Sequence, residues 1–71
     1  MGVFKLSQIS FIAFCIEKYA EYKNLKSNEV YKLLYDNGII DILIEDYEDL
    51  HGQGFEYMMP YIDKLLQGVK L

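Results

Sequence analysis

The segment SQISFIAFCIEKYAEYK, residues 7–23, decides the fold of this 71-residue chain. On a helical wheel at about 100° per residue, its apolar side chains fill an arc of about 200°. These residues are Ile9, Phe11, Ile12, Ala13, Cys15, Ile16, Tyr19, Ala20 and Tyr22. A surface helix that covers one core needs an apolar stripe of only about 100°. The spacing therefore predicts an amphipathic helix over residues 7–23 with more apolar surface than one small core requires.

Phe14 stands alone on the polar side of this predicted helix. Single exposed hydrophobic residues are ordinary in folded proteins. Aromatic clusters, however, often anchor protein interfaces. Phe14 is therefore a candidate contact residue, and Tyr19 and Tyr22 join it if their side chains are exposed.

Capping and turn residues set the bounds of the first two helices. Ser7 is the expected N-cap of the first helix, and Asn24 is expected to end it. Ser27 is the expected N-cap of a second helix over residues 28–37. Gly38 closes that helix, because glycine adopts the left-handed conformation after a last turn at little cost.

Residues 39–50 could form a strand or a helix, because the segment begins with a run of β-branched residues. A helix is favoured, since a lone strand would have no strand to pair with. Apolar residues also recur at spacings of three and four, at Ile40, Leu43, Ile44, Tyr47 and Leu50.

The glycines of residues 51–54 predict a turn, and a fourth helix follows over residues 55–67. Its apolar arc also spans about 200°. Pro60 lies on its polar side, where it either bends the helix with its ring toward solvent or marks a late start. Gly68 is expected to end it. The expected fold is thus an all-α, compact bundle of four short helices in one domain, residues 1–71.

Composition narrows the sources of stability. A chain this short has a core that supplies roughly 3–5 kcal/mol unless something else holds it together. A lone cysteine, Cys15, cannot form an intramolecular disulfide, and one histidine makes a structural zinc site improbable. No cofactor or metal is expected. The remaining source of additional stability is association with a second copy of the chain or with another protein.

Charge and hydropathy exclude other classes of partner. The net charge is −4 and all seven basic residues are lysines, so nucleic-acid binding is disfavoured. The longest apolar run, residues 11–16, is far too short to cross a bilayer, and no targeting segment is recognisable. We therefore expect a cytoplasmic protein that does not bind membranes.

Five carboxylates and no lysine lie between residues 41 and 49. Like charges four residues apart on a helix repel by roughly 0.2–0.5 kcal/mol per pair. One interpretation is a docking face for a basic partner, which would use Asp41, Glu45, Glu48 and Asp49. The other is a solvated face that keeps an apolar small protein in solution. The sequence leaves both open.

The turn at residues 51–54 offers little chemistry. His51 has no cysteine, serine or second histidine at a spacing that would complete a catalytic set, so we expect it to bond to backbone. The carboxylates before Gly52 are out of register for a calcium loop. Gly52-Gln53-Gly54 lacks the residues of a phosphate-binding loop.

The chain resembles a family of short bacterial proteins of unknown function. Residues 10–17, 29–34 and 47–57 carry the resemblance, with the Leu-His-x-Gln-Gly turn at residues 50–54 as its distinctive motif. Gly52 and Pro60 depart from the family pattern. Some members are encoded beside proteins resembling ADP-ribosyltransferases, which implies a neutralising role in a toxin–antitoxin pair. The resemblance also implies that His51 and Gln53 either hold the turn or touch the partner.

The leading hypothesis is a non-enzymatic interaction module that forms a homodimer, the favoured arrangement, or binds another protein, in its sharpest version as an antitoxin. The expected contact residues are Phe14, Tyr19, Tyr22, Asp41, Glu45, Glu48, Asp49, His51 and Gln53. No small-molecule substrate is evident. One alternative is a helix-turn-helix regulator that binds nucleic acid through the second and third helices. Another is a small enzyme acting through His51.

Overall fold

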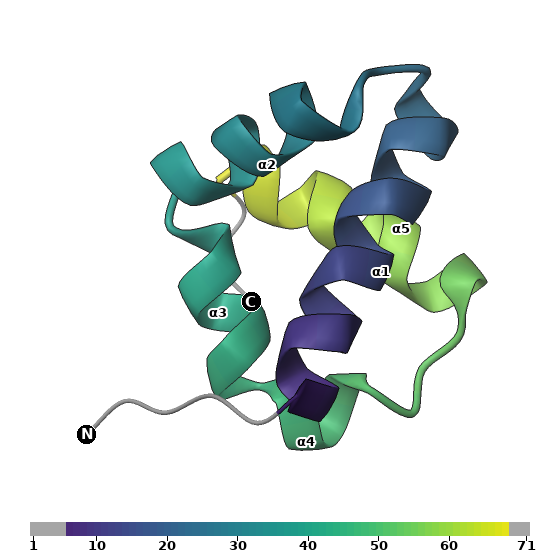
Figure 1. Cartoon of the computed structure of the whole chain (residues 1–71), viewed down its shortest axis with the longest axis vertical. Coiled ribbons are helices and arrows are strands. Elements are labelled where there is room, and N and C mark those ends of the chain that lie inside the picture. The colour runs from purple at the N-terminus through teal and green to yellow at the C-terminus, as the bar shows by residue number, and fades with distance from the viewer. Residues whose placement is uncertain (1–5, 69–71) are drawn as a thin grey trace.

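Five α-helices make up the chain over residues 6–68, the part described by the structure, which is a computed structural model (Figure 1). The helices are α1 (Leu6–Lys23), α2 (Ser27–Asp36), α3 (Ile39–Glu45), α4 (Tyr47–Leu50) and α5 (Phe55–Leu66). Residues 6–68 contain no strand, which confirms the all-α prediction and the helical interpretation of residues 39–50.

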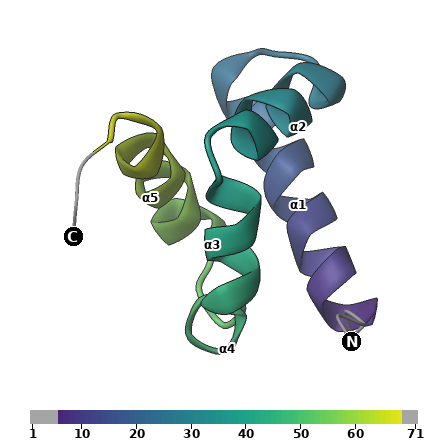
Figure 2. The same cartoon turned by 90° about the vertical axis from the view of Figure 1, so that its left-hand side faces the viewer.

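Helix α1 is the centre of the packing and contacts α2, α3 and α5. α2 crosses one end of the molecule, whereas α4 lies at the other end (Figure 1). A view turned by 90° shows α1 and α5 on opposite sides, with α3 between them (Figure 2). The face of α1 and α3 that is turned toward the viewer in Figure 1 is therefore not covered by α5.

Two backbone hydrogen bonds close the end of α1 after Lys23. The N–H of Leu25 donates to the carbonyl of Ala20 at 2.8 Å, and the N–H of Asn24 donates to the carbonyl of Glu21 at 3.3 Å. This pattern is a Schellman motif, which needs a residue in the left-handed conformation. Asn24 supplies it with φ of 59°, which confirms that Asn24 ends the helix.

Neither predicted serine N-cap is correct. α1 already includes Leu6, so Ser7 lies within the helix. α2 begins at Ser27 itself, and its N-cap is Lys26, whose backbone is extended. The Glu29 carboxylate accepts the backbone N–H of Lys26 at 3.0 Å. Glu29 thus stabilises the helix start from inside the first turn, and no hydroxyl is needed at the cap.

The end of α2 is as predicted. Gly38 has φ of 73°, in the left-handed region that favours glycine. Its N–H donates to the carbonyl of Tyr35 at 3.1 Å. The Asn37 side chain donates to the carbonyl of Leu33 at 2.8 Å, so polar groups satisfy the last turn.

The prediction of one helix over residues 39–50 is wrong, because the segment is divided at Asp46. Asp46 has φ of −98° and ψ of 16°, outside the helical range. The break changes the direction of the chain at the start of α4. Leu50 then joins the core, and Tyr47 packs edge-on against Phe11 with ring centroids 5.5 Å apart. The packing of Leu50 and Tyr47 offsets the free-energy cost of interrupting the helix at Asp46.

Helix α5 begins directly after the turn at residues 51–54, as predicted. It runs through Pro60, whose side chain is exposed. The late-start interpretation of Pro60 is therefore wrong, and its ring faces solvent. Gly68, with φ of 78°, follows the last turn and donates its N–H to the carbonyl of Leu65 at 3.1 Å.

The core lies between α1, α2, α3 and α5. Its members are Phe11, Cys15, Tyr19, Ala20, Val30, Leu34, Ile39, Leu43, Leu50, Met58, Met59 and Ile62. The predicted third stripe is corrected at two positions, because Ile40 and Ile44 are only partly buried, whereas Ile39 is buried in the core. Since α3 and α2 each direct only part of their apolar surface inward, apolar side chains remain on the outside.

Candidate protein-binding groove

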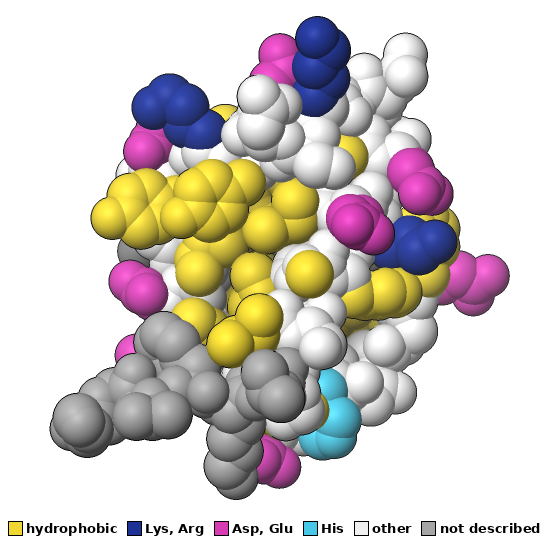
Figure 3. Space-filling model, in the orientation of Figure 1, with side chains coloured by type: hydrophobic (Ala, Val, Ile, Leu, Met, Phe, Trp, Pro, Cys, Tyr) yellow, Lys and Arg dark blue, Asp and Glu magenta, His cyan; other side chains and the backbone are white. Residues whose placement is uncertain are grey.

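An apolar groove of about 450 Å³ lies between α1, α2 and α3. It is lined by Gln8, Ile9, Ile12, Ala13, Ile16, Tyr31, Ile40 and Ile44. Figure 3 shows hydrophobic side chains gathered over these three helices on the face that α5 leaves open. Ile9 and Tyr31 are each 51% exposed, so the groove is open to solvent along its length.

The wide apolar arc of α1 explains the groove. Phe11, Cys15 and Tyr19 lie on one half of the arc and are buried in the core. Ile9 and Ala13 lie on the other half, four residues apart, and are exposed along the groove. Side chains three and four residues apart share one helix face. α1 therefore has two apolar faces, one packed and one open, as the sequence predicts.

Helix α3 divides its apolar residues in the same way. Ile39 and Leu43 are buried in the core, whereas Ile40 and Ile44 are partly exposed and line the groove. Each pair is spaced by four residues, so each forms its own row on the helix. The two rows put an apolar wall opposite α1.

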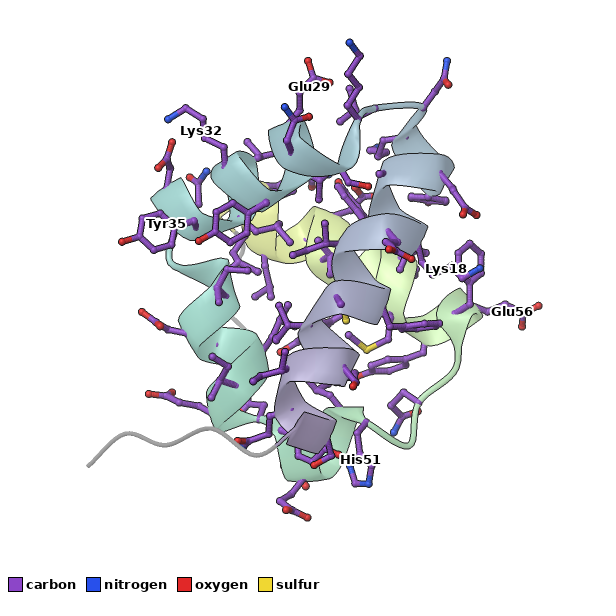
Figure 4. All side chains as sticks on the ribbon, in the orientation of Figure 1. Lys18, Glu29, Lys32, Tyr35, His51 and Glu56 are labelled. Atoms are coloured by element: carbon purple, nitrogen blue, oxygen red, sulfur yellow. The ribbon has the colours of Figure 1, made fainter. Side chains whose placement is uncertain are left out.

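Two neighbouring tyrosines of α2 are exposed near the groove, and of these Tyr31 lines it. The rings of Tyr31 and Tyr35 are stacked with centroids 5.9 Å apart. Figure 4 shows Tyr35 at the end of α2 that approaches α3. Of this helix only Val30 and Leu34 are buried, so both rings lie outside the core. The tyrosines supply exposed aromatic surface near the groove.

Carboxylates border the groove on its α3 side. Asp41 and Glu45 are exposed, and each follows directly on a lining isoleucine in the sequence. Glu48 and Asp49 are exposed on α4 and do not line the groove. Within residues 6–68, none of these four carboxylates forms an ion pair. We call Asp41 and Glu45 the acidic rim; its negative charge is uncompensated by that part of the chain.

Tyr19 is not available for contact with a partner. Its side chain is only 2% exposed, and its hydroxyl donates to the carboxylate of Asp63 on α5. Lys23 approaches the same carboxylate at 3.2 Å. The contact role predicted for Tyr19 is therefore wrong, because the residue lies at the middle of the apolar arc and packs inward.

This polar cluster shifts the pKa of both tyrosine and aspartate. Burial, followed by the bond to Asp63, raises the pKa of Tyr19 well above its usual range. Burial alone would raise the pKa of Asp63, but the hydrogen bonds from Tyr19 and Lys23 outweigh it and lower that pKa. Asp63 is thus a charged link between α1 and α5.

Tyr22 and Phe14 are both exposed, by 47% and 39%, but they do not line the groove. Tyr22 packs edge-on against Phe55 of α5, with centroids 6.3 Å apart. Phe14 lies on the polar side of α1. The structure therefore does not bring Phe14, Tyr19 and Tyr22 together into one aromatic cluster with the groove.

His51 and Gln53 are exposed in the turn before α5, and Figure 4 shows His51 at the end of the molecule away from α2. His51 Nδ1 lies 2.8 Å from the carbonyl of Tyr47, and because a carbonyl only accepts, Nδ1 carries the proton of this bond. The imidazole also stacks on the Tyr47 ring at 4.5 Å. These contacts are the backbone-bonding role expected of His51.

Other chemistry has little support in residues 6–68. No group of three or more histidine, cysteine, aspartate or glutamate side chains in this range is placed to hold a metal ion. Cys15 is fully buried, and burial raises the pKa of its thiol to about 12, so almost no thiolate forms near neutral pH. None of the described helices combines the length and the hydropathy needed to cross a membrane.

The sequence interpretation missed the residues that build the groove walls opposite α1. The sequence predicts Ile40 and Ile44 in the same apolar stripe as Leu43 and Leu50, whereas in the structure they line the groove. The doubled rows of apolar residues on α3 were an available signal, because a seven-residue helix cannot bury both rows in one core. Which row faces inward depends on contacts with α5, far away in the sequence.

Comparisons with known proteins give one match. The family model described as "Protein of unknown function (DUF3791)" matches residues 10–68, which is more than half of the chain. No curated protein and no solved structure matches it. The matched region includes all of α2, α3, α4 and α5 and most of α1, so six of the eight groove residues lie within it.

Proposed function

We propose that this chain, which belongs to the DUF3791 family of proteins of unknown function, is a non-enzymatic module that binds another protein through the apolar groove. The observation that carries the proposal is the groove itself, about 450 Å³ of apolar space with two half-exposed walls. A folded monomer gains nothing from leaving such surface in water, since burial contributes about 25 cal/mol per Å² of apolar area. A partner that covers the groove recovers that free energy.

The lining of the groove supports binding over catalysis. Of its eight residues, only Gln8 and Tyr31 carry polar side-chain atoms. Neither type of side chain serves as an acid, base or nucleophile near neutral pH without activation. The groove is also open along its length, whereas pockets for small molecules bury about 70–90% of their ligand. A protein surface fits this shape better.

The acidic rim supports a partner other than a second copy of this chain. Two copies would each bring a net charge of −4 and the same carboxylates, unpaired within residues 6–68, to the interface. Like charges placed opposite each other oppose association. Two concave grooves facing each other would also leave space between them. A basic partner avoids both costs, and the neutralisation of a basic toxin is one role of this kind.

Capture from the cells that make the protein tests this proposal. The wild-type chain carrying an affinity tag is compared with Ala13→Lys, which places a long charged side chain in the groove. Ala13 is exposed, and lysine has a helix propensity close to that of alanine, so the fold is expected to persist. Ser10→Lys is the matched control, because it adds the same charge on the polar side of α1.

The proposal expects one protein, identified by mass spectrometry, that wild type and Ser10→Lys recover and Ala13→Lys does not. Circular dichroism should show equal helix content in all three. Recovery of the same proteins in the same amounts by all three would contradict the proposal. So would light scattering that finds a wild-type dimer broken by Ala13→Lys.

A further inference from the structure

We infer that the groove binds a single amphipathic α-helix of the partner, with three apolar anchor side chains and a basic flank that faces the acidic rim. This inference rests on the proposed function and adds the chemistry of the occupant. Four features of the site support it. They are the lack of partners for the backbone groups of an extended peptide, the volume of the groove, the charge along its α3 edge and the charges on the α1 and α2 walls.

The first feature is the absence of hydrogen-bonding groups along the groove. Its walls are helices, whose backbone groups bond within each helix, and Gln8 and Tyr31 alone offer polar side-chain atoms. An extended peptide lying here would leave a row of its N–H and carbonyl groups without partners, at a cost for each buried group. An α-helix satisfies its own backbone groups. The occupant is therefore helical.

The second feature is the volume. A cavity left by removing one leucine side chain is about 150 Å³. The groove volume of about 450 Å³ thus holds roughly three such side chains. Helices that bind in grooves present anchors at positions i, i+3 or i+4, and i+7. Three anchors on two turns of helix match the space between Ile9 and Ile16 of α1.

The third feature is the charge of the α3 edge. Asp41 and Glu45 lie four residues apart, so they sit on one face of α3. Neither has an ion-pair partner within residues 6–68, and α3 and α4 carry no lysine or arginine. Figure 3 shows acidic side chains along this edge of the hydrophobic patch. Lysine or arginine on one flank of the bound helix would pair with them.

The α1 wall carries one comparable carboxylate, because Glu17 is exposed, follows the lining residue Ile16 directly and forms no ion pair within residues 6–68. Lys32 of α2 is paired with Asp36 at 3.2 Å, and Figure 4 shows it on the outer side of that helix. Lys18 of α1 lies near Glu21 at 3.8 Å, on the side of α1 away from α3. The α3 side therefore carries two such carboxylates and the α1 side one, so the electrostatic preference favours a basic flank that points toward α3.

Binding of designed peptides tests the inference. The probe is a fluorescein-labelled helical peptide with leucines at i, i+4 and i+7 and lysines along one flank. A second peptide replaces those lysines with glutamate, and a third is the first peptide with one central residue, other than a leucine or lysine, replaced by a proline that prevents a helix. Fluorescence anisotropy at low salt gives the dissociation constants with the full chain.

The acidic rim is tested with a double variant, Asp41→Asn with Glu45→Gln. The matched control is Glu48→Gln with Asp49→Asn, which removes the same charge from α4 outside the groove. For wild type, we expect the basic peptide to bind about fivefold more tightly than the acidic one, from two exposed ion pairs at low salt. The ratio should fall toward one in the rim variant and persist in the control.

Each other outcome overturns the inference in a distinguishable way. Equal binding of the basic and acidic peptides, or equal loss in both double variants, removes the role of the acidic rim. If the proline peptide binds as tightly as the basic helical peptide, the inference that the occupant is helical is wrong. If no peptide binds while Ala13→Lys still abolishes capture of a cellular protein, the proposed function stands and the helical occupant is wrong. If Ala13→Lys leaves capture of the cellular protein unchanged, both the proposed function and the helical occupant are wrong.

Discussion

At the scale of single residues, Asp63 is the side chain on which the packing of α1 against α5 most depends. It accepts hydrogen bonds from Tyr19 and Lys23, both on α1 and at least 40 positions earlier in the chain. Hydrogen bonds to a charged group each contribute about 1.5–3 kcal/mol. The cluster also orients Tyr19, whose ring would otherwise bring a buried hydroxyl into the core without a partner.

Asp63→Asn should therefore lower the free energy of unfolding at pH 7 by about 1–2 kcal/mol, because the charge that strengthens both bonds is lost. The folded-state pKa of Asp63 lies below its ordinary value of 3.8. The native chain thus binds fewer protons than the unfolded chain, and the stabilisation is present above pH 3.8. It is lost as the pH falls through the lower folded-state value.

Urea unfolding of wild type and Asp63→Asn across this pH range measures the effect. The difference between them should shrink as the solution is acidified below pH 3.8. Asp36→Asn is the control, since its exposed pair with Lys32 should contribute less than about 0.5 kcal/mol. A difference between wild type and Asp63→Asn that does not change with pH would contradict this account.

Residue roles could be predicted from the sequence only where they depend on near neighbours. The left-handed turns at Asn24 and Gly38 follow from residue type, and both are confirmed. Burial of Tyr19 was also readable, because it lies at the middle of the apolar arc of α1. The hydrogen bond between Tyr19 and Asp63 could not be predicted, because nothing in a single sequence indicates a contact between residues 44 positions apart.

At the scale of helices, apolar surface beyond what one core needs is the main feature of the fold. α1 and α3 each carry two rows of apolar residues, and only one row of each is buried. The width of the arc on α1 predicted this surplus. The break at Asp46 was not predicted, because the spacing from Leu43 to Tyr47 to Leu50 remains helical across it.

Pro60 tests how closely α5 follows ideal helix geometry. It lies inside the helix, where it removes one backbone hydrogen bond, and its ring is exposed. Pro60→Ala should therefore raise the free energy of unfolding by about 1–3 kcal/mol, since alanine restores the N–H and is the best helix former. Thermal unfolding followed by circular dichroism measures this change.

Ser10→Ala is the control for this effect. It replaces another exposed helical residue with alanine without restoring a hydrogen bond, and should change stability by about 0.5 kcal/mol or less. A Pro60→Ala chain that is less stable than wild type would show that α5 needs the proline for its shape.

At the scale of the whole molecule, the two sides of α1 differ in what covers them. α5 lies on one side of α1 (Figure 2), whereas the groove and its exposed hydrophobic side chains lie on the other (Figure 3). Tyr31 lines that open side with Tyr35 stacked on its ring, and the two carboxylates of the acidic rim each follow a lining isoleucine of α3. We therefore propose that the apolar groove, which residues 6–68 leave open, is covered when a partner binds.

The distribution of isoleucines allows a direct test of this central claim. The chain has eight isoleucines. Five line the groove, and they are Ile9, Ile12, Ile16, Ile40 and Ile44. The other three, Ile39, Ile42 and Ile62, lie outside it. Labelling the δ1 methyl groups therefore gives a set of groove reporters and a set of internal controls in one sample.

The measurement is a methyl NMR titration of the full chain with the captured partner. The account predicts that shift changes concentrate at the five groove isoleucines and that Ile62, on the opposite side of the core, changes least. It also predicts no change in any of the eight as the chain alone is concentrated. Changes concentrated at Ile62, or groove changes that grow with the concentration of the chain alone, would contradict it.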